Sequence, residues 1–214
     1  MPGLLSSNDL FYVAGHMTRT FATWTPSEAL ALMARPAREY RRRVGESRAA
    51  PWPQALAIPG LFALLLGIVT SAAATGRVVA SLVISQTVCW SFVPALQLMT
   101  GSMLIGSAGQ RPVSFARAIE LLFAAHGPWS LWLVAIAALQ MLTPNQNIVF
   151  ASTLAPALWT AWILFAYSRE VLSLPPGQAW VRVIAHQAAT ALLILTYMEL
   201  GSRLSVRVIG LLQR

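Results

Sequence analysis

Long apolar blocks separated by short polar segments are the feature that most constrains how this chain folds. The apolar residues do not recur at helical or strand period. They form runs of about 18 residues or more, the length at which a helix crosses the hydrocarbon core of a bilayer. With 57% hydrophobic residues, 10% charged residues and a mean hydropathy of +0.62, the chain has too little polar surface to face water. We therefore predict an all-α fold, a polytopic transmembrane helical bundle of about five spans.

The blocks divide the chain into a basic cytoplasmic segment (1–54), a transmembrane domain (55–202) and a basic tail (203–214). The second block is too long for a perpendicular crossing, so we expect a bend at Pro94. A kink is expected near Pro128 in the third block, and the short turn 143–147 predicts an antiparallel hairpin of blocks three and four. The expected spans are 55–74, 78–105, 118–142, 148–167 and 183–200.

The segment before the first span carries a helix-start signal and a run of arginines. Thr25-Pro26-Ser27-Glu28 has the form of a capping box with proline at the first helical position, which predicts a helix start. Leu30 and Met33 would share one side of a short amphipathic helix resting on the membrane, with the arginines at headgroup level. A solvated basic linker is the alternative. The arginines predicted to contact lipid or a partner are Arg38, Arg41, Arg42 and Arg43.

Arginine placement predicts the orientation in the membrane, because arginine is enriched in cytoplasmic flanks. All fifteen Lys and Arg residues are Arg, which is typical of a GC-rich bacterial genome, and their position beside apolar blocks indicates anionic lipid headgroups rather than nucleic acid. Eleven arginines fall in the segment 1–54 and the loops 106–117 and 168–182, against four at Arg77 and in the tail. We predict a bacterial inner-membrane protein with a cytoplasmic amino terminus. The three tail arginines oppose this rule.

Three ionisable residues inside the spans are the candidates for a functional site: Glu120, His126 and His186. An ionisable group at membrane depth costs about 2.5 to 3.5 kcal/mol on insertion scales, so each one is a hypothesis of function. All three would lie in the cytoplasmic half of the bilayer and could meet in one polar pocket, as a proton relay or a metal site. Interhelical hydrogen bonding is the commoner use of such residues. Because no metal-binding motif is present, we predict no catalytic residue, metal or cofactor.

The small residues and the sequence motifs of the chain do not indicate a specific reaction. Gly60 with Gly67, and Gly101 with Gly106, predict close helix packing without being a strict Gly-x-x-x-Gly. The single cysteine, Cys89, forms no internal disulfide. The chain has no Walker loop, Gly-x-Gly-x-x-Gly, Cys-x-x-Cys or Gly-x-Ser-x-Gly, which argues against an ATPase, a dinucleotide enzyme, a haem-attachment protein and a serine hydrolase.

Two segments resemble the Yip1-like membrane proteins. The first is Ala34-Arg35-Pro36 followed by Tyr40-Arg41-Arg42, just before the first span. The second is 162–179, where a tryptophan-containing span leads through Arg169-Glu170-Val171-Leu172-Ser173-Leu174 to Gln178-Ala179. The resemblance implies roughly five spans, a cytoplasmic amino-terminal segment and a membrane scaffold or adaptor. Eukaryotic members of that family are associated with vesicle trafficking and with binding of small GTPases.

Three functions from different classes follow from these observations. The first is a non-enzymatic inner-membrane scaffold, adaptor or assembly factor of Yip1-like type, with a membrane-protein partner bound by the arginine-rich segment. The second is a small transporter or permease component in which Glu120, His126 and His186 line a polar route, with prolines breaking helices along it. The third is an intramembrane metal-dependent enzyme that uses the same three residues.

Overall fold

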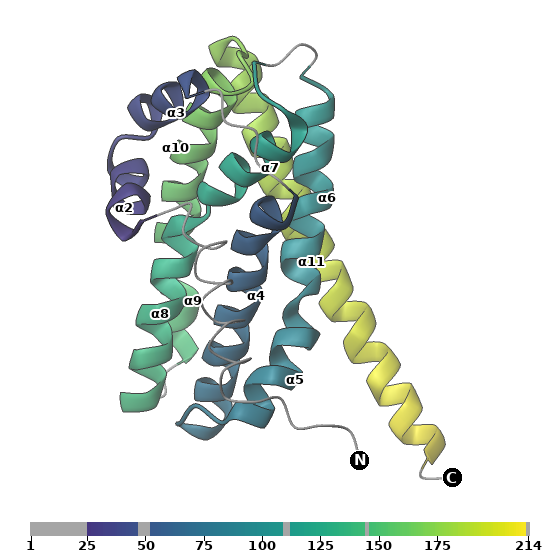
Figure 1. The fold of residues 1–214 in the computed structure, drawn as a ribbon. Helices are drawn as coiled ribbons and strands as arrows, with labels where there is room; N and C mark the ends of the chain where they lie inside the picture. The colour runs from purple at the N-terminus through teal and green to yellow at the C-terminus, as the bar shows by residue number, and fades with distance from the viewer. Residues whose placement is uncertain (1–24, 47–51, 109–111, 144–145, 213–214) are drawn as a thin grey trace, which may run out of the picture.

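The computed structural model describes residues 25–46, 52–108, 112–143 and 146–212, without the side chains of residues 146, 150 and 201–212. All regular structure in these residues is helical (Figure 1), which confirms that the fold is all-α. Residues 1–24, which include much of the predicted amino-terminal segment, lie outside the described residues, as do Arg48 and Arg111. The elements are α2 Pro26–Ala34, α3 Pro36–Gly45, α4 Trp52–Thr75, α5 Ala80–Trp90, α6 Phe92–Gly106, α7 Phe115–Ala124, α8 Gly127–Leu142, α9 Gln146–Ser152, α10 Leu154–Glu170 and α11 Pro176–Leu212.

Several of these helices are long and apolar enough to cross a membrane. Within the described residues, four stretches qualify: Trp52–Thr75, Ala80–Gly106, Asn147–Glu170 and Pro176–Leu200. A fifth is obtained if α7 and α8, bent by 41° at their junction, count as one span. The described part of the chain therefore contains four or five such helices, close to the five blocks expected, and α11 continues into the tail as far as Leu212.

Prolines explain where the long helices break. The non-helical residues Ser91, His126 and Thr153 come two or three positions before Pro94, Pro128 and Pro156. A proline within a helix has no N–H for the i−4 carbonyl, and its ring clashes with that carbonyl, so the preceding turn opens. The bend expected at Pro94 is thus found at Ser91, and the kink expected near Pro128 is the bend between α7 and α8.

A tight hairpin joins α4 to α5. Gly76 has a positive φ of 67°, a conformation that favours glycine. The hydroxyl of Ser71 accepts a hydrogen bond from the Val79 amide at 3.0 Å, and Thr75 Oγ1 donates to Arg77 O at 2.8 Å. Because Gly67 lacks a side chain, α5 approaches its backbone closely: a Cβ there would lie 2.7 Å from Val83 O. Gly67 therefore serves the close packing that the sequence predicts, whereas a Cβ at Gly60 would meet nothing within 4 Å.

The short helix α7 lies at the centre of the larger buried cluster. Every residue from Ala116 to Phe123 is buried, and α4, α6 and α10 contact this helix. Tyr167 Oη donates to Ala118 O at 3.0 Å, and Tyr40 Oη donates to Leu121 O at 3.2 Å. Two tyrosines from distant parts of the chain thus hold α7 in place. A second, smaller buried cluster packs α4 against α6 and α8 through residues such as Phe62, Val93 and Ile136.

The predicted amphipathic surface helix is not supported by the structure. The capping box is present, with Thr25 Oγ1 accepting from the Glu28 amide at 3.2 Å and Glu28 accepting from the Thr25 amide at 3.0 Å. The segment then breaks at Arg35 into α2 and α3, because Pro36 disfavours a helical residue before it. Instead of sharing one membrane-facing side, Met33 is buried against the protein while Leu30 is 58% exposed.

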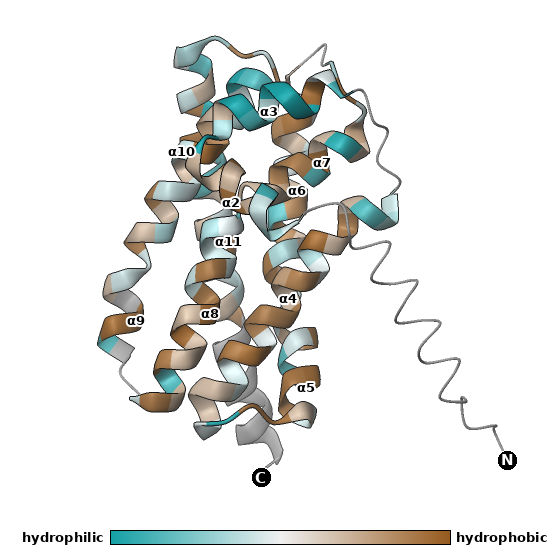
Figure 2. Cartoon of the chain, turned by 60° about the vertical axis from the view of Figure 1, so that its left-hand side comes forward, coloured by the Kyte–Doolittle hydropathy of each residue, from teal (hydrophilic) through white to brown (hydrophobic). Residues whose placement is uncertain are grey.

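Polar and apolar surface are separated along the bundle. Figure 2 shows hydrophilic residues concentrated on α3, and hydrophobic residues along α4, α5 and α8. Figure 1 shows α3, the end of α6 and the end of α10 at one end of the molecule, with the α4–α5 turn at the other. The predicted cytoplasmic loops therefore share one end. Large apolar side chains are exposed on α5, α10 and α11, among them Ile84, Val88, Leu154, Leu158 and Leu192.

Candidate functional site

The predicted site residue Glu120 lies in α7 and forms a buried ion pair. Its carboxylate accepts from Arg117 at 2.6 Å, three residues earlier on the same helix, and the side chains are 0% and 6% exposed. The predicted loop 106–117 is too long at its end, because Arg117 lies inside α7 and is buried. The two opposite charges offset much of the cost of removing each from water.

The two predicted histidines lie next to each other. His126 occupies the break between α7 and α8, and His186 lies on α11, with ring centroids 6.4 Å apart and the rings nearly perpendicular. Each is only 5% exposed. His126 Nδ1 lies 3.2 Å from Leu122 O, whereas His186 Nδ1 has no hydrogen-bond partner in the part of the chain that the structure describes.

A line of polar side chains continues from the histidines between α6 and α11. Thr190 lies one turn from His186, and its hydroxyl is 2.9 Å from the hydroxyl of Thr100 on α6. Gln97, three residues before Thr100, is 8% exposed, and its Oε1 has no partner among the described residues. We call His126, His186, Thr190, Thr100 and Gln97 the polar seam. It offers imidazoles, hydroxyls and an amide, all on buried side chains.

The structure thus brings two of the three predicted residues together. His126 and His186 are in contact, while Glu120 is engaged with Arg117. Among the described residues, no three His, Cys, Asp or Glu side chains are close enough to hold a metal ion. The seam can exchange protons or hydrogen-bond a polar solute, since imidazoles and hydroxyls both donate and accept.

The four predicted arginines of α3 divide into two kinds. Arg42 lies 2.9 Å from Glu39 and also pairs with Glu46, and Arg43 is buried with its guanidinium 3.3 Å from Glu28. The hydrogen bond with Glu39 raises the pKa of Arg42, and burial lowers the pKa of Arg43. Arg42 also lies 3.6 Å from Glu28 on α2, so both arginines link α3 to α2.

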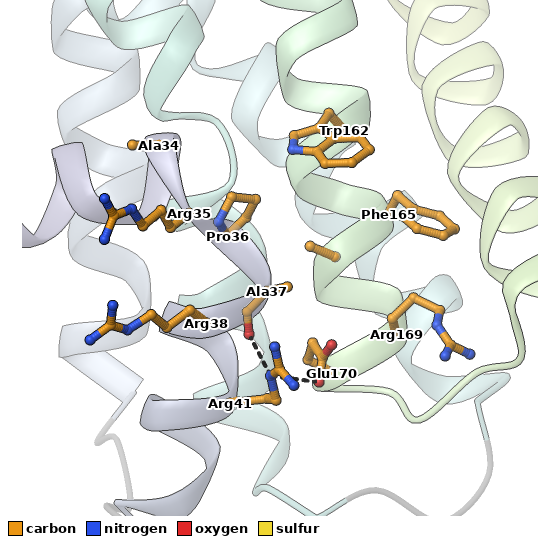
Figure 3. A pocket seen from close by; sticks show the side chains of 11 residues that line it. Ala34, Arg35, Pro36, Ala37, Arg38, Arg41, Trp162, Phe165, Arg169 and Glu170 are labelled. Atoms are coloured by element: carbon orange, nitrogen blue, oxygen red, sulfur yellow. Dashed lines mark hydrogen bonds and ion pairs between the residues drawn. The ribbon is translucent and has the colours of Figure 1, made fainter.

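The other two, Arg38 and Arg41, are exposed on α3. Arg41 is 68% exposed, and its Nε lies 3.7 Å from Glu170 on α10. Arg38 is exposed and has no ion-pair partner within the described residues. Figure 3 shows Arg41 directed toward Glu170, and Arg38 directed away from α10 beside Arg35.

The sequence does not predict the residues that position α3, α7 and the polar seam. Tyr40, Tyr167, Thr100 and Thr190 each contact a residue at least 49 positions away. Their only sequence signal is a polar atom in a mainly apolar context, which does not identify a partner. The pairing of Arg117 with Glu120 at i and i+3 was readable from the sequence.

The fold and the seam together define a class: an all-helical bundle with four or five helices able to cross a membrane, a buried polar seam and an arginine-bearing helix pair at one end. The chain matches no protein-family model, no curated protein and no solved structure. The resemblance to Yip1-like proteins stays a prediction.

Proposed function

We propose that the chain is a non-enzymatic scaffold, adaptor or assembly factor of Yip1-like type in the bacterial inner membrane, with a cytoplasmic amino terminus. The observation that carries the proposal is the fixed attachment of α3 to the bundle. Tyr40 is fully buried, and its ring packs edge-on against Tyr167 with centroids 5.7 Å apart. The arginines of α3 are therefore held in a defined pattern on the outside of the bundle.

A defined charged pattern is what a partner protein recognises, because complementary charges orient and select partners. α2 contributes to the same arrangement: Trp159 Nε1 on α10 donates to Met33 O at 3.0 Å, and Glu28 on α2 pairs with Arg43 on α3. The partner we expect is a membrane protein with an acidic surface near the headgroup region.

Site-specific photo-cross-linking in native membranes tests the scaffold proposal. A photoreactive residue replaces Arg41, which is exposed on α3, and a matched control replaces Leu158, which is 63% exposed on α10. We expect one protein adduct of defined mass at Arg41 and none at Leu158. The adduct should weaken when Tyr40→Ala releases α3. Adducts at both sites, or at neither, would contradict the proposal.

The polar seam supports a second candidate, a small transporter or permease component. The unpartnered His186 Nδ1 and Gln97 Oε1 are buried groups that a transported proton or polar solute would satisfy. Proteoliposomes with an internal pH dye test this candidate. The wild type should conduct protons faster than empty liposomes, and His186→Asn should abolish the difference. The control Thr160→Val alters a buried hydroxyl on α10, outside the seam. Equal rates in wild-type and empty liposomes would remove this candidate.

A further inference from the structure

The elbow between α2 and α3 carries two arginines whose charge the protein does not neutralise. Arg35 and Arg38 are exposed and lie three residues apart, and no described residue forms an ion pair with either of them. The nearby acids are already engaged: Glu39 with Arg42, and Glu170 with Arg41. A pair of positive charges therefore remains at this elbow.

The same two arginines border two hollows on the surface. One, of about 440 Å³, lies between α3 and α10 and includes Pro36, Trp162 and Phe165 in its lining. The other, of about 480 Å³, includes Leu30 and Ala31 of α2. Figure 3 shows Trp162 on α10 across from Pro36 on α3, whereas Phe165 extends away from α3 and stacks on Trp180 of α11. Each hollow thus combines guanidinium groups with apolar or aromatic wall.

The position of the elbow along the bundle fits the boundary between headgroups and acyl chains. Arg169 and Glu170 end α10, and Trp162 lies two turns earlier, 56% exposed. Tryptophan and arginine are enriched at this depth, because their apolar parts face acyl chains while their polar groups face headgroups.

We propose that the elbow binds the headgroup of an anionic phospholipid, with Arg35 and Arg38 contacting the phosphate and the wall at Trp162 contacting the upper acyl chain. Guanidinium groups hydrogen-bond phosphate oxygens in pairs, and two arginines three residues apart on a turn can hold one phosphate. A free anion has no acyl chain and would not contact the apolar wall at Trp162. The presence of this wall therefore favours a lipid over a free anion. This proposal does not depend on the scaffold function.

Lipid adducts counted by native mass spectrometry test the site. The full chain is released from detergent with equimolar phosphatidylglycerol and phosphatidylcholine of identical acyl chains. The wild type should retain phosphatidylglycerol preferentially. Arg35→Gln and Arg38→Gln should each reduce that preference about fivefold, the effect of one arginine at a membrane surface. Trp162→Ala should reduce retention of both lipids.

Matched controls carry the same charge change elsewhere. Arg182→Gln removes an arginine at the same end of the bundle, where it donates to Ser107 at the end of α6, and Arg77→Gln lies in the α4–α5 turn at the opposite end. Leu158→Ala removes exposed apolar surface of α10 away from the hollow. All three should keep the wild-type preference.

Several results would overturn the proposal. Equal retention of the two lipids by the wild type would show that the elbow does not select anionic lipid. An equal loss in Arg182→Gln or Arg77→Gln would show diffuse attraction rather than a site. Displacement of phosphatidylglycerol by inorganic phosphate would show a free-anion site.

Discussion

At the residue scale, the charge pair inside α7 is the feature whose burial costs the most hydration free energy. Arg117 and Glu120 are almost completely buried, so each depends on the other for compensation of its lost hydration. The pair also separates Glu120 from the predicted site with His126 and His186, because its carboxylate accepts from the Arg117 guanidinium at 2.6 Å.

Removal of one member of this pair should destabilise the protein far more than removal of both. Glu120→Leu leaves a buried guanidinium without its carboxylate, and the expected loss in the free energy of unfolding is about 3 to 5 kcal/mol. Thermal unfolding in detergent measures this. The double change Arg117→Leu and Glu120→Leu should recover most of the loss. A double variant as unstable as the single one would show that the pair does not account for the cost.

At the scale of the elements, close helix packing and tyrosine docking hold the bundle together. α5 lies against the backbone of α4 at Gly67, and α3 lies against α7 and α10 through Tyr40. The hydrogen bonds of the two tyrosines run to carbonyl oxygens of α7. The position of α7 therefore depends on residues on either side of it in the sequence.

Gly67→Ala should lower stability, because the new Cβ would approach the backbone atoms Val83 O and Thr87 N to 2.7 and 2.9 Å. Gly60→Ala is the control: its Cβ meets nothing within 4 Å, and alanine favours a helix by about 1 kcal/mol over glycine. Comparison of the two melting temperatures in detergent tests this. A Gly67→Ala variant as stable as Gly60→Ala would contradict the close α4–α5 approach.

Docking of α3 should weaken at high pH. Burial, followed by the neighbouring Tyr167, raises the pKa of Tyr40 well above its ordinary value of 10.0. Above pH about 10 the undocked tyrosine ionises while the docked one does not, so docking is fully stable below that pH and is lost as the pH rises toward the raised pKa.

The distance between spin labels at Gly45 on α3 and Leu158 on α10 measures this docking. At neutral pH we expect a single short distance between the two labels. At alkaline pH a second population with a longer distance should appear and increase with pH. Tyr40→Phe removes the ionisable group, so its distance should change less with pH. An identical pH response in both proteins would show that another group is responsible.

At the scale of the whole molecule, the five-span arrangement depends on whether α7 and α8 form one bent crossing. Figure 1 shows α8 running from the level of α7 toward the end that holds the α4–α5 turn. If α7 and α8 together cross the membrane once, Gly106 and Gly177 lie on one side of it and Thr143 lies on the other.

Single cysteines at these three positions, in a Cys89→Ser background, test the topology with a membrane-impermeant maleimide. In inverted vesicles Gly106→Cys and Gly177→Cys should react, while Thr143→Cys should react only in intact spheroplasts. This pattern supports five spans with the α3 end cytoplasmic. Reaction of Thr143→Cys from the same side as Gly106→Cys would instead show that α7 and α8 form a re-entrant segment.

The sequence by itself determined the helical class, the approximate spans, the breaks before Pro94 and Pro128, and the capping box at Thr25. These features depend on hydropathy and backbone chemistry over a few neighbouring residues, which a linear sequence contains. Only the tertiary structure decided that His126 meets His186 and that α3 docks through Tyr40. These contacts depend on how each helix is rotated and which distant helix it meets, and that is settled by packing of the whole bundle.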